Sequence, residues 1–105
     1  SREIQYAKPP KYPSTSRDIA MVVDESTAVA DIEKVIKEAG TEILRGVKLF
    51  DIYRGIQVGK GKKSVAYSLT YRHDDRTLTD VETEEAHAKV VEALKNNLGA
   101  SIRDN

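Results

Sequence analysis

A carboxylate and a phenol stand two positions apart in LFDIYRG, residues 49–55. Asp51 can accept hydrogen bonds from the N–H edge of a nucleic-acid base, and Tyr53 can stack on the flat face of one. Because side chains alternate along a strand, residues two apart lie on the same side of a sheet. If residues 43–54 form a strand with one uncovered side, the pair indicates a surface suited to splayed, single-stranded bases.

The strand expected at 63–72 adds small and hydroxyl-bearing side chains to that surface. Its alternation is strict, with Val65, Tyr67, Leu69 and Tyr71 on one side and Ser64, Ala66, Ser68 and Thr70 on the other. Small side chains let a flat ring come close to the backbone, which suits a bound base. The same pattern also fits contact with another protein domain, or an ordinary solvated surface. Asp51 argues most against a merely solvated strand, since Asp is depleted in strands.

Four cations and three glycines fill the segment RGIQVGKGKK, residues 54–63, which is typical of an exposed turn between two strands. Beside the candidate base contacts, cations that could reach phosphates are Arg54, Lys60, Lys62 and Lys63. A charged turn is equally typical of ordinary solvated structure. Over the whole chain Lys plus Arg (17) equals Asp plus Glu (17), which argues against strong RNA binding by this chain alone.

Other site chemistries fit the sequence less well. Five residues separate Gly55 from Gly61 and a strand follows, so the segment is not a phosphate-binding P-loop. The adjacent residues 73–75, HDD, cannot converge on one metal ion. An acyl-phosphate hydrolase would want an Asn near the glycine turn, and the asparagines stand at 96, 97 and 105. We therefore expect no catalytic residue and no metal site.

The elements that must position these residues can be predicted from apolar spacing. Strands are expected at 17–24, 43–54, 63–72 and 100–103, with one helix ending at Gly40 and another ending near Leu98 before Gly99. Ser26 or Thr27 is expected to cap the first helix, and Thr79 with Glu82 to form a capping box for the second. The order βαββαβ predicts an α+β, ferredoxin-like fold, with a four-stranded antiparallel sheet and both helices on one face.

Two helices cover only one face of such a sheet, so the apolar side chains must lie beneath them. The expected covered set is Ile19, Met21, Val23, Phe50, Ile52, Val65, Tyr67 and Leu69. The expected open set is Ala20, Val22, Asp51, Tyr53, Ser64, Ala66 and Ser68. Leu49 and Phe50 are adjacent apolar residues, which breaks the alternation and indicates a β-bulge or a partly covered second face.

Several segments of this chain resemble one family in order and spacing. RDIAMVV, LFDIYRG, KKSVAYSLTYR and RTLTD together resemble the ferredoxin-fold anticodon-binding domain of bacterial phenylalanyl-tRNA synthetase β subunits, over about residues 12–103. The resemblance implies binding of the anticodon stem-loop of phenylalanine tRNA, with the first anticodon base on the open face. By this resemblance, the residues that contact the base correspond to Asp51, Tyr53 and Ser64, and more weakly to Ala66, Ser68 and Arg72. The glycine turn and Thr83 depart from the family's common pattern.

The resemblance also implies a setting for the chain. It implies a non-catalytic module at residues 12–105, preceded by a lead-in at 1–11, within a phenylalanine–tRNA ligase that joins an α subunit as α2β2. ATP and magnesium would serve the α subunit. The absence of cysteine and of an apolar leader in residues 1–16 favours a cytoplasmic protein. The alternative function is a ferredoxin-like protein-interaction or small-ligand regulatory domain.

Overall fold

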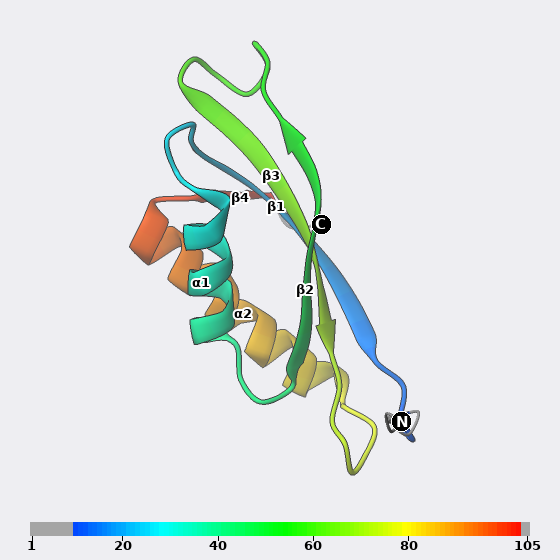
Figure 1. The fold of residues 1–105 in the computed structure, drawn as a ribbon. Coiled ribbons are helices and arrows are strands. Elements are labelled where there is room, and N and C mark those ends of the chain that lie inside the picture. Colours follow the sequence, from blue (N-terminus) through cyan, green and yellow to red (C-terminus); the bar gives the residue numbers. More distant parts are fainter. Residues whose placement is uncertain (1–9, 104–105) are drawn as a thin grey trace, which may run out of the picture.

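The computed structural model describes residues 10–103, which form one antiparallel sheet with two helices on one of its faces (Figure 1). Along the chain the elements are β1 (Thr15–Asp24), α1 (Val29–Ala39), β2 (Leu44–Tyr53), β3 (Lys62–Tyr71), α2 (Asp80–Leu98) and β4 (Ser101–Arg103). The strand order is β2-β3-β1-β4. The predicted ferredoxin-like α+β fold is therefore confirmed. Most of the lead-in expected at residues 1–11 lies outside the described residues.

The central strands β1 and β3 pair over their whole length, and their alternation divides core from open face as predicted. Ile19 stands opposite Tyr67 and Met21 opposite Val65, and all four side chains are buried. The helices complete this core with Ile32 and Ile36 from α1 and Ala86, Val90 and Leu94 from α2. Burying each large apolar side chain contributes about 1.5–3 kcal/mol, so this layer supplies most of the stability that holds the sheet in place.

The two helices begin in different ways. The hydroxyl of Thr79 accepts from the Glu82 backbone N–H at 3.1 Å and the Glu82 carboxylate accepts from the Thr79 N–H at 2.9 Å, which confirms the capping box of α2. For α1 the predicted Ser26 or Thr27 cap is wrong, because Ala28 occupies the N-cap and no side chain caps the helix. The chain turns at this point, with the Thr27 N–H donating to the Asp24 carbonyl at 3.0 Å.

A β-bulge in β2 changes the side on which Phe50 lies. Pairing passes from Leu49 opposite Tyr67 directly to Asp51 opposite Ala66, so Phe50 has no partner on β3. The bulge was expected from the adjacent apolar residues, but placing Phe50 on the covered face was wrong. Its side chain is 53% exposed and lines a hollow on the open face together with Ala66.

Ile52 was also expected to be buried, and this too is wrong, since it is 38% exposed. It shares the helix side with its partner Val65, which is fully buried. However, β2 is one of the two edge strands, and the β2–β3 hairpin extends beyond α1 (Figure 1). The helices therefore do not cover this end of the sheet.

Candidate nucleic-acid interface

The sheet face opposite the helices brings together the five open-face candidates Asp51, Tyr53, Ser64, Ala66 and Ser68. Residues paired across strands project to the same side, so the pairings define rows on this face. One row contains Tyr53, Ser64 and Val22, and the next contains Asp51, Ala66 and Ala20. Beside Tyr53 and Asp51, the side chains of Ser64, Ala66 and Ala20 are small or hydroxyl-bearing. They form a shallow floor on which a flat ring can lie.

Tyr53 and Asp51 are both accessible on this floor. The Tyr53 side chain is 44% exposed, and its hydroxyl donates to Gln57 Oε1 at 2.8 Å. That bond holds the ring over the beginning of the hairpin turn, close to Gly55. Asp51 is exposed and makes no side-chain hydrogen bond or ion pair with any residue the structure describes. A phenol ring and a free acceptor are thus presented together.

The cations proposed to reach phosphates are less available than expected. Arg54 donates to Glu25 at 2.6 Å, and Lys62 donates to Asp24 at 2.7 Å. Both pairs are half exposed, so each is worth little and can be exchanged for a phosphate. At the other end of β3, Arg72 donates to Asp74 at 2.8 Å.

The expectation that Lys63 belongs to the exposed turn is wrong. Lys63 stands in β3 opposite Val23, on the helix side of the sheet, and is only 5% exposed. A strand residue next to Ser64 must point to the opposite side from it. The exposed cations of the hairpin are therefore Arg54, Lys60 and Lys62.

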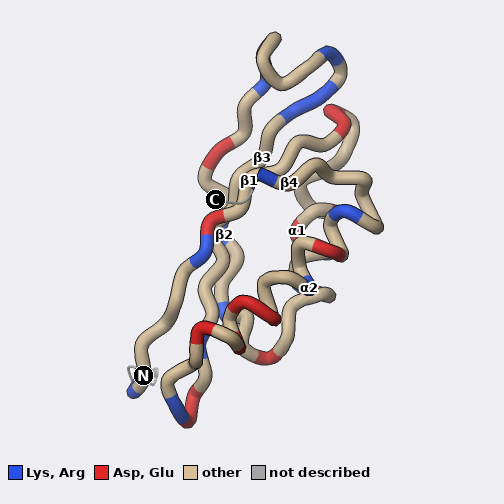
Figure 2. Tube along the Cα trace, turned by 180° about the vertical axis from the view of Figure 1, so that it is seen from behind, with Lys and Arg blue, Asp and Glu red and all other residues tan. Residues whose placement is uncertain are grey.

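The helix layer carries the opposite charge. The sequence of α2 contains five carboxylates against two lysines, while cations mark the β2–β3 hairpin (Figure 2). A phosphate backbone is repelled by the first surface and attracted by the second. The charge distribution therefore favours the hairpin edge of the open face as the surface for a polyanion, although the net charge is zero.

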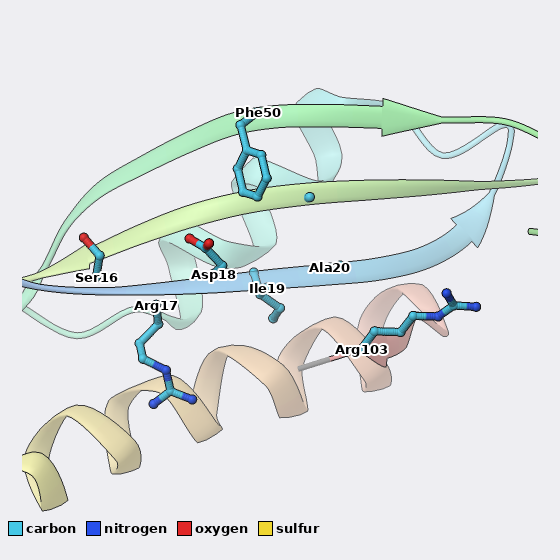
Figure 3. A pocket seen from close by; sticks show the side chains of 8 residues that line it. Ser16, Arg17, Asp18, Ile19, Ala20, Phe50 and Arg103 are labelled. Atoms are coloured by element: carbon cyan, nitrogen blue, oxygen red, sulfur yellow. The ribbon is translucent and has the colours of Figure 1, made fainter. Parts of the chain in front are cut away.

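A hollow of about 570 Å³ extends this face toward the part of β1 that precedes its pairing with β4 (Figure 3). Residues that line it include Ser16, Asp18, Ala20, Phe50, Ala66 and Arg103. The sequence pattern predicts no contact role for Asp18, Phe50 or Arg103. Alternation alone places Asp18 on this side, whereas Phe50 reaches it only through the bulge, and Arg103 reaches it because β4 pairs with β1.

The part of the chain that the structure describes contains no group of three or more His, Cys, Asp or Glu residues placed to hold a metal ion. The magnesium that the family resemblance implies for the α subunit has no fitting donor set among these residues. No helix among residues 10–103 is long and apolar enough to cross a membrane.

The fold and its open face correspond to a known family. Residues 10–103 match the ferredoxin-fold anticodon binding domain, so the chain belongs to that family. It is similar to phenylalanine–tRNA ligase β subunits from Clostridium tetani, at 52% identity over 96% of the chain, and from Bacillus subtilis, at 47% over 93%. The β subunit of Moorella thermoacetica is 48% identical over 94%. The chain spans only 13%, 12% and 12% of these relatives, respectively.

Proposed function

We propose that this domain binds the anticodon stem-loop of phenylalanine tRNA on the open face of its sheet. The first anticodon base stacks on Tyr53, Asp51 accepts from the N–H edge of that base, and the Ser64 hydroxyl bonds it from the side. The cations of the hairpin, led by Arg54 and Lys62, contact phosphates. The observation that carries the proposal is that Tyr53 stands directly opposite Ser64 and one row from Asp51, on the face that no helix covers.

The open-face carboxylate supports base contact rather than phosphate contact. A carboxylate repels a phosphate, but it accepts well from the N–H groups of a base, as recognition sheets do with unstacked nucleotides. An aromatic ring beside it adds stacking that every base can use. The small floor formed by Ser64 and Ala66 allows that base to lie against the sheet.

The setting of the domain follows from the same relatives. We infer that it is a non-catalytic module of a phenylalanine–tRNA ligase β subunit, acting with an α subunit in an α2β2 assembly in the cytoplasm. ATP and magnesium then serve aminoacylation elsewhere in the assembly. The domain supplies tRNA affinity and orientation to that reaction.

The direct test is a titration of the 15N-labelled 105-residue chain with the anticodon stem-loop of phenylalanine tRNA. We expect weak binding, because the net charge is zero, with amide shifts along β2 and β3 around Tyr53 and Ser64. Shifts confined to α1 and α2, or none at millimolar stem-loop, would contradict the proposal.

Substitutions of Tyr53 test the stacking step. Tyr53→Ala should weaken stem-loop binding about 5- to 150-fold, since one stacked base contributes about 1–3 kcal/mol. Tyr53→Phe is the matched control: it keeps the stacking ring and should lose less affinity than Tyr53→Ala, since it removes only the hydrogen bond to Gln57 that helps to hold the ring. In the intact ligase, Tyr53→Ala should reduce tRNA affinity and leave adenylate formation unchanged. Equal loss of both activities would exclude this division of labour.

Exposed apolar side chains favour one alternative, a protein-docking role. Phe50 is 53% and Ile56 is 93% exposed, and the chain is a small part of much longer relatives. Under this alternative the remainder of the protein, or a partner subunit, would cover the open face. Association of the purified chain with those parts in the absence of RNA, with amide shifts on β2 and β3, would favour docking over base binding.

A further inference from the structure

We propose that Gln57 is a positioning residue for RNA binding, which holds the Tyr53 ring from the β2–β3 hairpin turn in the orientation that stacking requires. The inference rests on the proposed function, because it assumes that a base stacks on Tyr53. It goes beyond that function by giving a role to a side chain that orients the ring without contacting RNA. The family resemblance gives Gln57 no role, since the glycine turn departs from the family's common pattern.

The first step is the way in which the Tyr53 ring is held. The outer part of the ring lies against Gly55, since a Cβ atom on that glycine would be 2.6 Å from Tyr53 Oη, 2.8 Å from Cζ and 3.0 Å from Cε2. The Tyr53 hydroxyl donates to Gln57 Oε1 at 2.8 Å. Contact with a glycine has little directional preference, whereas a hydrogen bond favours one distance and one angle. The bond to Gln57 therefore fixes the tip of the ring.

The second step is the conformation of the turn that carries Gln57. The Val58 N–H donates to the Gly55 carbonyl at 3.0 Å, which closes a four-residue turn with Gln57 at its third position. A second turn follows, in which the Lys62 N–H donates to the Gly59 carbonyl at 3.2 Å. The backbone of the hairpin thus sets the place of Gln57 relative to the end of β2.

The third step is the attachment of this hairpin turn to the end of β1. The Glu25 N–H donates to the Gly61 carbonyl at 2.8 Å, and the Glu25 carboxylate accepts from Arg54 at 2.6 Å. Lys62 donates to Asp24 at 2.7 Å. These contacts connect both sides of the turn to a neighbouring segment, so the turn can act as a support for the ring.

The fourth step is the energetic role that remains for Gln57. Its side chain is exposed, and among the described residues Tyr53 is its hydrogen-bond partner. The Tyr53 side chain is itself 44% exposed, so no core packing holds the ring on its outer side. A side chain that is free before binding must be ordered when the ligand binds, which weakens affinity. Holding the ring in advance removes that cost.

The first measurement reports the position of the ring without RNA. The ring current of Tyr53 should displace the resonances of Gly55 in spectra of the isotopically labelled 105-residue chain, because the two are in contact. Gln57→Met keeps the length of the side chain but offers only a weak sulfur acceptor. It should move the Gly55 resonances toward their positions in Tyr53→Ala. Gln57→Glu keeps an acceptor oxygen at the same length and should leave them displaced.

The second measurement is the dissociation constant for the anticodon stem-loop of phenylalanine tRNA. Gln57→Met should weaken binding about 2- to 12-fold, which is the cost of ordering one side chain on binding. In a Tyr53→Phe background the same substitution should have no further effect, because the hydroxyl through which Gln57 acts is absent. Gln57→Glu is left out of this titration, since its negative charge also repels phosphate.

A matched control lies next to Gln57 in the same turn. Ile56 is 93% exposed, so Ile56→Ala shortens a neighbouring side chain without removing a contact to the ring. This variant should change neither the Gly55 resonances nor the affinity for the stem-loop. The dispersed amide spectrum of each variant reports that it is folded.

The outcomes separate this proposal from the proposed function. Unchanged Gly55 resonances in Gln57→Met would overturn the positioning role. Displaced resonances with unchanged affinity, or an equal loss of affinity in both Tyr53 backgrounds, would also overturn it, while shifts at Tyr53 and Ser64 on binding would leave the proposed function standing. Absence of stem-loop binding by the unsubstituted chain would overturn both. Displaced resonances and a loss of affinity that requires the Tyr53 hydroxyl, with an unchanged control, would establish the role.

Discussion

Gly55 offers a way to displace the Tyr53 ring without removing it. A Cβ atom on Gly55 would lie 2.6 Å from Tyr53 Oη and 2.8 Å from Cζ, and real Cβ contacts essentially never fall under 3.0 Å. In Gly55→Ala the ring must therefore move by several tenths of an ångström and loses its present alignment with Gln57. The backbone of Gly55 is not among the positive-φ glycines, so alanine fits it without strain.

The expected magnitudes differ for stability and for RNA binding. Replacing a glycine by alanine at a compatible position gains about 0.4–1 kcal/mol, and losing the exposed Tyr53–Gln57 bond costs about 0.5–1.5 kcal/mol. The free energy of unfolding should therefore change by no more than about 1 kcal/mol. Stem-loop affinity should fall, by up to the 5- to 150-fold that about 1–3 kcal/mol of stacking represents.

A double-mutant cycle decides whether the displaced ring is the cause. Dissociation constants for the stem-loop are measured by amide titration for Gly55→Ala, Tyr53→Ala and the double variant. If Gly55→Ala acts only through the ring, it should have no further effect in the Tyr53→Ala background. An equal loss in both backgrounds would refute the reasoning. Gly61→Ala is the control, since no atom lies within 4 Å of its Cβ but its φ of +74° makes alanine strained, so it should lower stability without moving the ring.

Three further predictions concern the scaffold. Thr79→Ala removes the N-cap of α2 and should lower the free energy of unfolding by about 0.5–2 kcal/mol in urea titrations, while Thr79→Ser should largely preserve it. Ile36→Ala empties a fully buried core position and should cost about 2–5 kcal/mol by the same measurement, and a loss under 1 kcal/mol would contradict the described packing. The Arg76 guanidinium, assisted by Thr79, lowers the pKa of Glu82 from 4.5 to about 2, so its stabilising effect is complete above pH 4.5 and is lost as the pH falls toward 2. Thermal unfolding of Glu82→Gln should accordingly show a shallower decline over that interval than the unsubstituted chain, and parallel curves would exclude the role.

Local signals in the sequence were sufficient for most of the scaffold. Period-two alternation in β1 and β3 separates Ile19 and Val65 from Ala20 and Ser64, because neighbouring strand residues must face opposite sides. The capping box and Gly99 define α2 in the same way, since both act within one helical turn. These features involve only residues close in sequence, so pattern is enough to predict them. Alternation about Ile52 places Asp51 and Tyr53 on one side together, but the bulge between Leu49 and Asp51 is what puts that side on the open face.

Tertiary structure alone decided the side on which Phe50 lies and the partners of the cations. A bulge is visible in sequence as broken alternation, but which residue leaves the ladder depends on the register that β3 imposes on β2. Arg54 and Lys62 meet Glu25 and Asp24, residues 29 and 38 positions away in the chain, because the hairpin and the end of β1 lie side by side. Ala28 rather than a hydroxyl residue is the N-cap of α1, because Thr27 belongs to the turn that its N–H closes with the Asp24 carbonyl. Local preference could specify elements and faces in this chain, whereas contacts between distant segments determined which side chains border the hollow.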